Sequence, residues 1–251
     1  MKISQMVDEP TIPPAIGPAN SEGIAIVEVG AKPVKYHVHK ALLVFHSEYF
    51  RKALQGPWKE AHEGAVRLSD AGAAEFNVFV HWLYTQQLPL TSHMIAHISG
   101  DEREHASGLA LVKAYALGDR LLAFGFRRAI NNHVVGPYGG IAIAPRAYVP
   151  AVRWAFENIP CERPLLQFLV NDFCANWYAK HDNKDDVEAL RQFPMTSIMR
   201  AMRRYSLARE DEGDGCFLEH ATVAERRSCK HTHPEYTTGH DGYGYVGELD
   251  D

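Results

Sequence analysis

Cysteine is scarce in this chain: only Cys161, Cys174, Cys216 and Cys229 occur among 251 residues. Small secreted proteins held by disulfides carry a far higher density of cysteine, so that class is excluded and reduced thiols are expected. Long apolar runs are also lacking, since no segment approaches the roughly 18 uninterrupted apolar residues of a membrane-spanning helix. The N-terminal residues hold no apolar stretch of the kind found in a secretory leader. We therefore expect a soluble intracellular protein, in the cytoplasm or the nucleus, that binds no membrane.

Positive charge is not in excess either. The chain has 26 lysines and arginines against 31 aspartates and glutamates, a formal net charge of −5. No basic surface suited to a general nucleic-acid binder is expected from this balance. Catalytic strings such as Gly-x-Ser-x-Gly and His-Glu-x-x-His are missing. We therefore expect no enzyme, no small-molecule substrate and no cofactor, in a chain whose composition is ordinary for a globular protein.

The first part of the chain alternates between strand and helix patterns. Proline-rich residues 1–22 predict a flexible lead-in, after which IAIVEVG, stopped by Gly30, and YHVH predict a β-hairpin. Apolar residues three and four apart then predict two short helices, the second capped by Ser47. Residues 65–69 predict a third strand, and Asp70 is expected to cap a longer helix whose buried stripe is Phe76, Phe79, Val80 and Leu83.

The rest of the chain is predicted to be helical, with a disordered end. Two amphipathic helices, separated near Gly118-Asp119, complete an ordered block over residues 23–136. Within this block the run around Leu121 and Leu122 is expected to be buried together with Phe76, Phe79 and Leu83. We assign 137–149 to a linker and 150–210 to a helical extension that docks on the preceding block. Residues 211–251 are rich in glycine, histidine and charge, so a mostly disordered tail is expected there.

Short pieces along residues 23–136 follow one another in a characteristic order. They are Val38-His39-Lys40, Ser47-Glu48-Tyr49-Phe50, Trp58-Lys59-Glu60, and Trp82-Leu83-Tyr84-Thr85 followed by Leu88-Pro89. In this order and spacing they resemble the BTB (POZ) domain, in the form widespread in fungal proteins. The predicted fold class is α+β, with a small sheet led by a β-hairpin, a cluster of helices covering it, and an additional helical C-terminal extension.

The resemblance implies a non-enzymatic scaffold for protein–protein interaction that self-associates as a homodimer. In this chain the surface would come from residues 38–54. There Leu42, Leu43, Val44 and Phe45 follow one another so closely that one helix face cannot bury all four. The alternative is a monomer in which the C-terminal extension covers this surface.

A second interpretation of the resemblance is a substrate adaptor that binds the cullin scaffold of a cullin-RING ubiquitin ligase. Family members use a hydrophobic residue, any residue and then glutamate at the start of one helix. The matching positions here are Phe76, Asn77 and Val78, so the acidic acceptor is replaced by valine. Phe76 is also explained as an ordinary core residue.

The C-terminal tail suggests a third function class. Thiols and imidazoles cluster at Cys216, His220, Cys229, His231 and His233, and zinc would take four of these five. Such a site would suit a zinc-binding, nucleic-acid-associated regulator. The alternative is a solvated histidine-rich tail without metal, because the spacing matches no common zinc finger.

Overall fold

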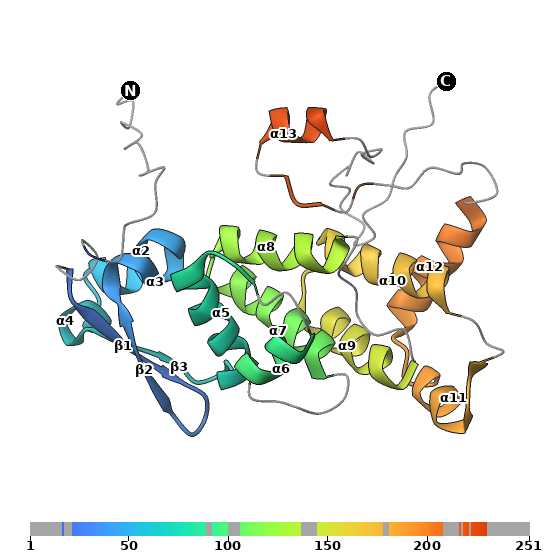
Figure 1. Cartoon of the computed structure of the whole chain (residues 1–251), viewed down its shortest axis with the longest axis horizontal. Helices are drawn as coiled ribbons and strands as arrows, with labels where there is room; N and C mark the ends of the chain where they lie inside the picture. Colours follow the sequence, from blue (N-terminus) through green and yellow to red (C-terminus); the bar gives the residue numbers. More distant parts are fainter. Residues whose placement is uncertain are drawn as a thin grey trace.

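The computed structural model describes residues 22–88, 92–99, 106–136, 145–177, 181–207, 218–220 and 222–229, with the single positions 17 and 216. In Figure 1 a small sheet lies at one end of an elongated molecule and α11 and α12 lie at the other. The elements in chain order are β1 (Ile24–Val29), β2 (Val34–His39), α2 (Lys40–His46), α3 (Glu48–Gln55), α4 (Lys59–Glu63), β3 (Ala65–Leu68), α5 (Ala73–Thr85), α6 (Ser92–Ser99), α7 (Ala106–Arg120), α8 (Phe124–Val135), α9 (Pro145–Asn158), α10 (Pro164–Asn176), α11 (Lys184–Leu190), α12 (Met195–Leu207) and α13 (Val223–Ser228).

The sheet has the strand order β2-β1-β3, with β1 antiparallel to β2 and parallel to β3. The predicted hairpin is present, and its turn contains Gly30 at φ 92°, a conformation that favours glycine. Alternate residues of β1, namely Ala25, Val27 and Val29, are buried, as expected for a strand with one face on the core. Helices cover that face, so the α+β class is confirmed.

Ser47 joins the first helical pair to the rest of the domain. Its hydroxyl accepts a hydrogen bond from the backbone N–H of Phe50 at 3.2 Å, which confirms it as the N-cap of α3. The same hydroxyl donates to the carbonyl of Leu121 at 2.6 Å. One buried side chain therefore caps α3 and ties it to the turn between α7 and α8.

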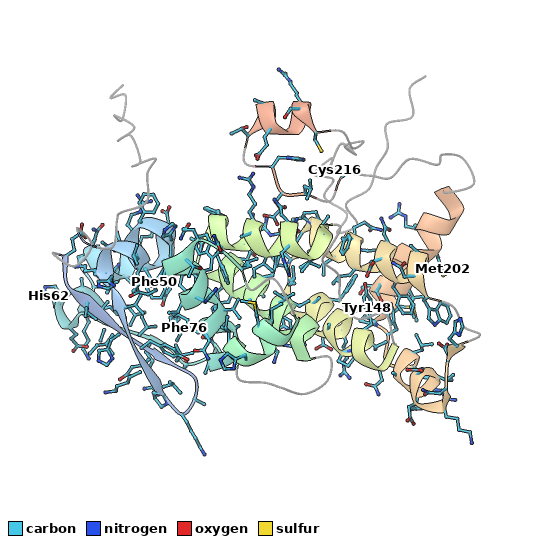
Figure 2. All side chains as sticks on the ribbon, in the orientation of Figure 1. Phe50, His62, Phe76, Tyr148, Met202 and Cys216 are labelled. Carbon is cyan, nitrogen blue, oxygen red and sulfur yellow. The ribbon has the colours of Figure 1, made fainter. Side chains whose placement is uncertain are left out.

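The core of the N-terminal block is aromatic. Phe79 lies at its centre, with ring centroids 6.4 Å from Phe50, 5.7 Å from Phe76 and 5.1 Å from Phe126, and all four rings are fully buried. Figure 2 shows Phe50 and Phe76 in this region, between the sheet and the long helices. The predicted apolar stripe of α5 therefore packs against both α3 and α8.

Two helix boundaries differ from the prediction. Helix α5 begins at Ala73, where the Glu75 carboxylate accepts a hydrogen bond from the Gly72 N–H at 2.6 Å. Asp70 is not the cap; it pairs instead with Arg120 at 2.8 Å.

The break between α7 and α8 comes later than expected, at residues 121–123, and Gly118 lies inside α7. A Cβ at Gly118 would stand 3.0 Å from the Phe126 ring, so this glycine permits close packing of the two helices. The chain turns instead at Leu122, whose φ is 50°. Leu122 is 37% exposed, so the prediction that it joins Leu121 in the core is wrong.

The C-terminal extension starts earlier than predicted. Residues 145–149, which we assigned to the linker, belong to α9, and Tyr148 and Val149 are buried. The Tyr148 hydroxyl donates to the carbonyl of Leu169, and its ring lies 5.3 Å from that of Phe173. These contacts bring α10 against α9. The extension also packs on the preceding block, because α9 contacts α7 and α10 contacts α8.

The tail prediction is wrong in part. Residues 1–16 and 230–251 lie outside the described residues, but positions 216–229 include the short helix α13 and side chains that contact α7 and α8. We call the described positions 216, 218–220 and 222–229 the strap. Within the part of the chain that the structure describes, no helix is long and apolar enough to cross a membrane.

Candidate interaction surface and metal centre

The segment predicted for self-association lies partly inside the molecule. Leu42 is 3% exposed and Leu43 is fully buried, so neither can take part in an interface without unfolding α2. Val44 and Phe45 are half-buried. The expectation that one helix face cannot cover all four side chains agrees with this division, and only Val44 and Phe45 remain available to a partner.

The segment predicted to face a cullin is internal. Phe76 and Val78 are fully buried in the core, and the Asn77 side chain accepts a hydrogen bond from the Tyr36 hydroxyl at 2.7 Å. Burial, and then the nearby Glu75 carboxylate, raise the pKa of Tyr36, which keeps this hydroxyl protonated as a donor. The interpretation of Phe76 as a core residue therefore describes the structure better than a surface role.

An exposed apolar surface lies next to the α2–α3 junction. Leu122, in the turn between α7 and α8, is 37% exposed, and Phe124, the first residue of α8, is 55% exposed. The backbone carbonyls of Leu121 and Leu122 accept hydrogen bonds from the N–H groups of Tyr49 and Glu48. We call Leu122 and Phe124 the turn patch. The sequence predicts Leu122 in the core and assigns no surface role to Phe124, although the run Leu-Leu-Ala-Phe holds more apolar side chains than one turn can bury.

His46 lies at the edge of this region, between Phe45 and Trp82. Its ring makes edge-on contacts with both, at centroid distances of 4.7 and 5.0 Å. Its Nε2 accepts a hydrogen bond from the Gln86 amide at 3.3 Å, which requires an unprotonated nitrogen. Burial lowers the pKa of His46 from 6.5 to about 4.

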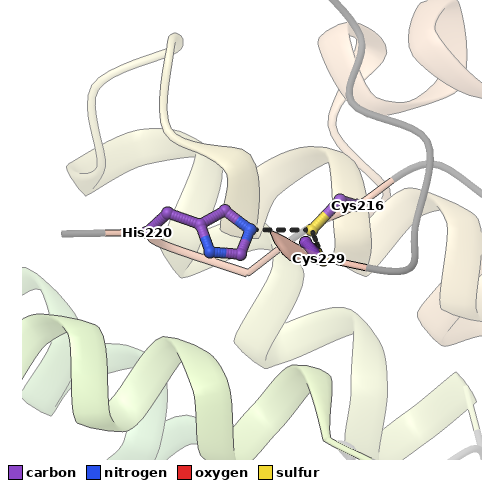
Figure 3. A group of neighbouring side chains, drawn as sticks. All are labelled: Cys216, His220 and Cys229. Atoms are coloured by element: carbon purple, nitrogen blue, oxygen red, sulfur yellow. Dashed lines mark hydrogen bonds between the residues drawn. The ribbon is translucent and has the colours of Figure 1, made fainter. Parts of the chain in front are cut away.

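The strap brings three of the predicted zinc ligands together. Figure 3 shows Cys216, His220 and Cys229 with their side chains converging. The Cys216 sulfur lies 3.2 Å from His220 Nε2 and 3.6 Å from the Cys229 sulfur, and the three potential ligand atoms all lie within 4.8 Å of one another. His231 and His233 lie outside the described residues.

Between these ligands, Glu219 enters a polar network on α7 and α8. Its carboxylate accepts hydrogen bonds from the Tyr115 hydroxyl at 2.6 Å and from Arg127 Nε at 3.0 Å. Arg127 also pairs with Asp119 at 2.6 Å, and Arg163 reaches the same Asp119 oxygen at 2.7 Å. The side chains of Arg127, Asp119 and Glu219 are 14%, 15% and 11% exposed.

The charges of this network compensate one another. Burial, and then the Glu219 charge, raise the pKa of Tyr115 well above 10.0, so its hydroxyl stays a donor. Burial alone would lower the pKa of Arg127, but Glu219 and Asp119 outweigh it and the net shift is upward. The sequence alone does not point to Glu219, because its partner Tyr115 stands 104 positions away.

Comparison with protein families gives a direct match to the sheet and the helices that cover it. Residues 25–102 match the family model described as BTB/POZ domain. The chain contains a BTB/POZ domain. No curated protein matches the chain significantly.

The match runs from β1 through α6 of the BTB domain. Helices α7 and α8 lie beyond it, yet Phe126 of α8 packs on Phe79 in the core of the matched part. BTB domains are generally protein–protein interaction modules rather than enzymes, and the chain therefore carries an interaction module. The matched family model says nothing about a fungal origin.

The stability of the BTB domain is expected to depend on pH through His46. Because the folded state holds this ring neutral with a pKa of about 4, the unfolded chain binds a proton more readily below pH 6.5. The contribution of His46 is thus complete above pH 6.5 and is lost as the pH falls toward 4, with a slope of up to about 1.4 kcal/mol per pH unit. Urea unfolding over this range is expected to show a shallower decline for His46→Gln than for the wild type.

Two comparisons make this measurement specific. His133 is also half-buried, and burial lowers its pKa, so only the difference between His46→Gln and the wild type reports on His46. The variant His62→Gln removes an exposed imidazole and controls for the loss of one histidine. Parallel pH profiles for the wild type and His46→Gln would contradict the prediction.

Proposed function

We propose that the BTB domain acts as a self-associating scaffold, a homodimer formed through the turn patch. The observation that carries the proposal is the exposure of Leu122 and Phe124 beside the first helical pair, the region through which the domain type resembled by this sequence commonly pairs. A two-fold axis would place the same patch opposite itself, so a single apolar surface supplies both halves of the interface.

The position of the C-terminal extension favours the homodimer over the alternative of a monomer in which the extension covers the self-association surface. Helices α9 and α10 pack on α7 and α8, and Figure 1 places α9 to α12 at the end of the molecule away from α2 and α3. The extension therefore leaves the α2–α3 region open to a second copy. A stable dimer would bury at least about 1,000 Å² in total, an area that includes the half-buried Val44 and Phe45 at its margin.

Light scattering at micromolar concentration tests the proposal. A homodimer is expected to give about twice the 28.1 kDa mass of one chain. The double variant Leu122→Asn with Phe124→Ser is expected to return the mass to that of one chain. Asparagine is chosen because it tolerates the positive φ of position 122. Val44→Glu is expected to act in the same direction, though its half-buried position requires a check of folding by circular dichroism.

The control is Trp58→Ser, because Trp58 is 59% exposed, close to the 55% of Phe124, but follows α3 instead of α7. This variant is expected to keep the dimer mass. A wild-type mass near 28.1 kDa would reject self-association. An equal effect of Trp58→Ser and the double variant would reject the turn patch as the interface.

The cullin adaptor remains the alternative function for a BTB protein. The burial of Phe76 and Val78 removes the surface that we expected a cullin to contact, so nothing on α5 favours this role. Copurification of the chain with a cullin would support the adaptor role.

A further inference from the structure

The strap holds a set of side chains that the interaction function of the BTB domain does not use. Two thiols and one imidazole converge there, with Cys216 only 4% exposed. They come from two points of the strap, because Cys216 and Cys229 stand 13 positions apart and flank α13. Among the described residues this is the cluster whose donor atoms are close enough to share one metal ion.

The spacing of these atoms matches a tetrahedral zinc ion. With Zn–S bonds of about 2.3 Å and Zn–N bonds of about 2.0–2.1 Å, tetrahedral angles place two sulfurs about 3.8 Å apart and a sulfur and a nitrogen about 3.6 Å apart. The corresponding distances are 3.6 Å between the two sulfurs and 3.2 Å from the Cys216 sulfur to His220 Nε2. For these two pairs the donor atoms need to move by only a few tenths of an ångström to enclose the ion, and the third pair, His220 Nε2 and the Cys229 sulfur, lies within 4.8 Å. A disulfide would require a much larger approach, because its two sulfurs lie about 2.05 Å apart.

We propose that Cys216, His220 and Cys229 bind a structural zinc ion as three of its four ligands. Thiolate and imidazole donors in a set of four select zinc, and structural zinc sites are closed by four protein ligands. The sequence offers the fourth donor two and four positions after Cys229.

The zinc ion fixes the strap on the BTB domain and its adjoining helices. Glu219 stands one position before the ligand His220, and its backbone N–H donates to the Asn132 side chain of α8 at 3.2 Å. Glu225, between His220 and Cys229, pairs with Arg128 of α8. Metal binding restrains the loop that presents both carboxylates, so the ion acts as a clip between the C-terminal chain and α8.

Metal analysis of the full chain, purified under reducing conditions without chelator, is the first test. One zinc ion per chain is expected. Replacement by Co²⁺ is expected to give the intense visible bands of tetrahedral coordination and a thiolate-to-cobalt charge-transfer band. The cobalt spectrum reports on the wild-type chain directly, so it does not depend on whether a variant folds.

Variants then assign the ligands. Cys229→Ser and His220→Ala are expected to lower the zinc content at least about tenfold, while Cys161→Ser, which changes an exposed cysteine outside the strap, is expected to leave it unchanged. Either His231→Ala or His233→Ala is expected to weaken binding, and the other to have little effect. Removal of zinc is expected to speed hydrogen exchange in α8 around Asn132, with no change around Phe79.

Three results would overturn the proposal. The first is a full chain that contains no zinc and gives no thiolate band with Co²⁺. The second is an equal loss of zinc in Cys161→Ser and Cys229→Ser. The third is mass spectrometry of the unreduced chain, purified under native conditions, showing a disulfide between Cys216 and Cys229. None of these results bears on the mass measured by light scattering, so failure here is distinguishable from failure of the homodimer.

Discussion

Replacing Phe79 by alanine is expected to lower the free energy of unfolding by about 3–5 kcal/mol, as for other fully buried aromatic side chains. The ring contacts Phe50, Phe76 and Phe126, which come from α3, α5 and α8. Its removal leaves a cavity that three helices would have to close together. Rigid aromatic neighbours on every side limit that collapse, so the cavity contributes to the loss along with the lost burial.

Urea unfolding followed by circular dichroism measures this change, with the slope of the transition as a check that unfolding stays cooperative. The matched control is Trp58→Ala, which removes an aromatic side chain that is 59% exposed and is expected to change the stability by less than about 0.5 kcal/mol. A loss below about 0.5 kcal/mol for Phe79→Ala would show that this ring is not in the core.

The second large effect is expected from Arg127→Met, at about 3 kcal/mol. Arg127 pairs with both Glu219 and Asp119 in a region where all three side chains are at least 85% buried. Methionine keeps much of the side-chain volume but leaves two carboxylates without their main cation. Arg163 still pairs with Asp119, so Glu219 is the carboxylate that chiefly loses its compensating cation.

Arg120→Met provides the matched control, because Arg120 pairs with Asp70 at the surface, where the two side chains are 39% and 71% exposed. An exposed pair contributes about 0–1 kcal/mol, so this variant should be nearly neutral. Combining Arg127→Met with Glu219→Gln is expected to recover part of the loss, because the second change removes the buried negative charge. Equal losses for Arg127→Met and Arg120→Met would contradict the network.

The sequence predicts the parts of the fold that depend on local patterns. Ser47 before a helical run indicates an N-cap, and the spacing of Phe76, Phe79 and Leu83 indicates a buried stripe; both predictions are confirmed. Helix boundaries that depend on tertiary packing are harder to predict from the sequence. Gly118 resembles a helix breaker, yet it lies inside α7. Its missing side chain leaves room there for the Phe126 ring of α8. Tyr148 lies in a segment whose composition predicts a linker, and its burial depends on Leu169 and Phe173 of another helix.

The candidate sites also divide into features that local sequence patterns predict and features that only the fold reveals. The sequence names Cys216, His220 and Cys229 as candidate zinc ligands because thiols and imidazoles cluster in this short part of the chain. It cannot distinguish the buried Leu42 and Leu43 from the half-buried Val44 and Phe45, since all four residues are apolar and only the packing of α2 separates them. Glu219 is one acidic residue among 31, and only the fold places it beside Arg127.

The separation of 104 positions between Tyr115 and Glu219 has a consequence for synthesis of the chain. At about 5–20 residues per second, the ribosome reaches Glu219 about 5–20 s after it has added Tyr115. The β-sheet and α5 are translated before this delay begins, and α8 is translated early within it. During the rest of the delay, the nascent chain contains Arg127 and Asp119 but not yet Glu219, whose carboxylate pairs with Arg127. Synthesis of the strap then provides this carboxylate.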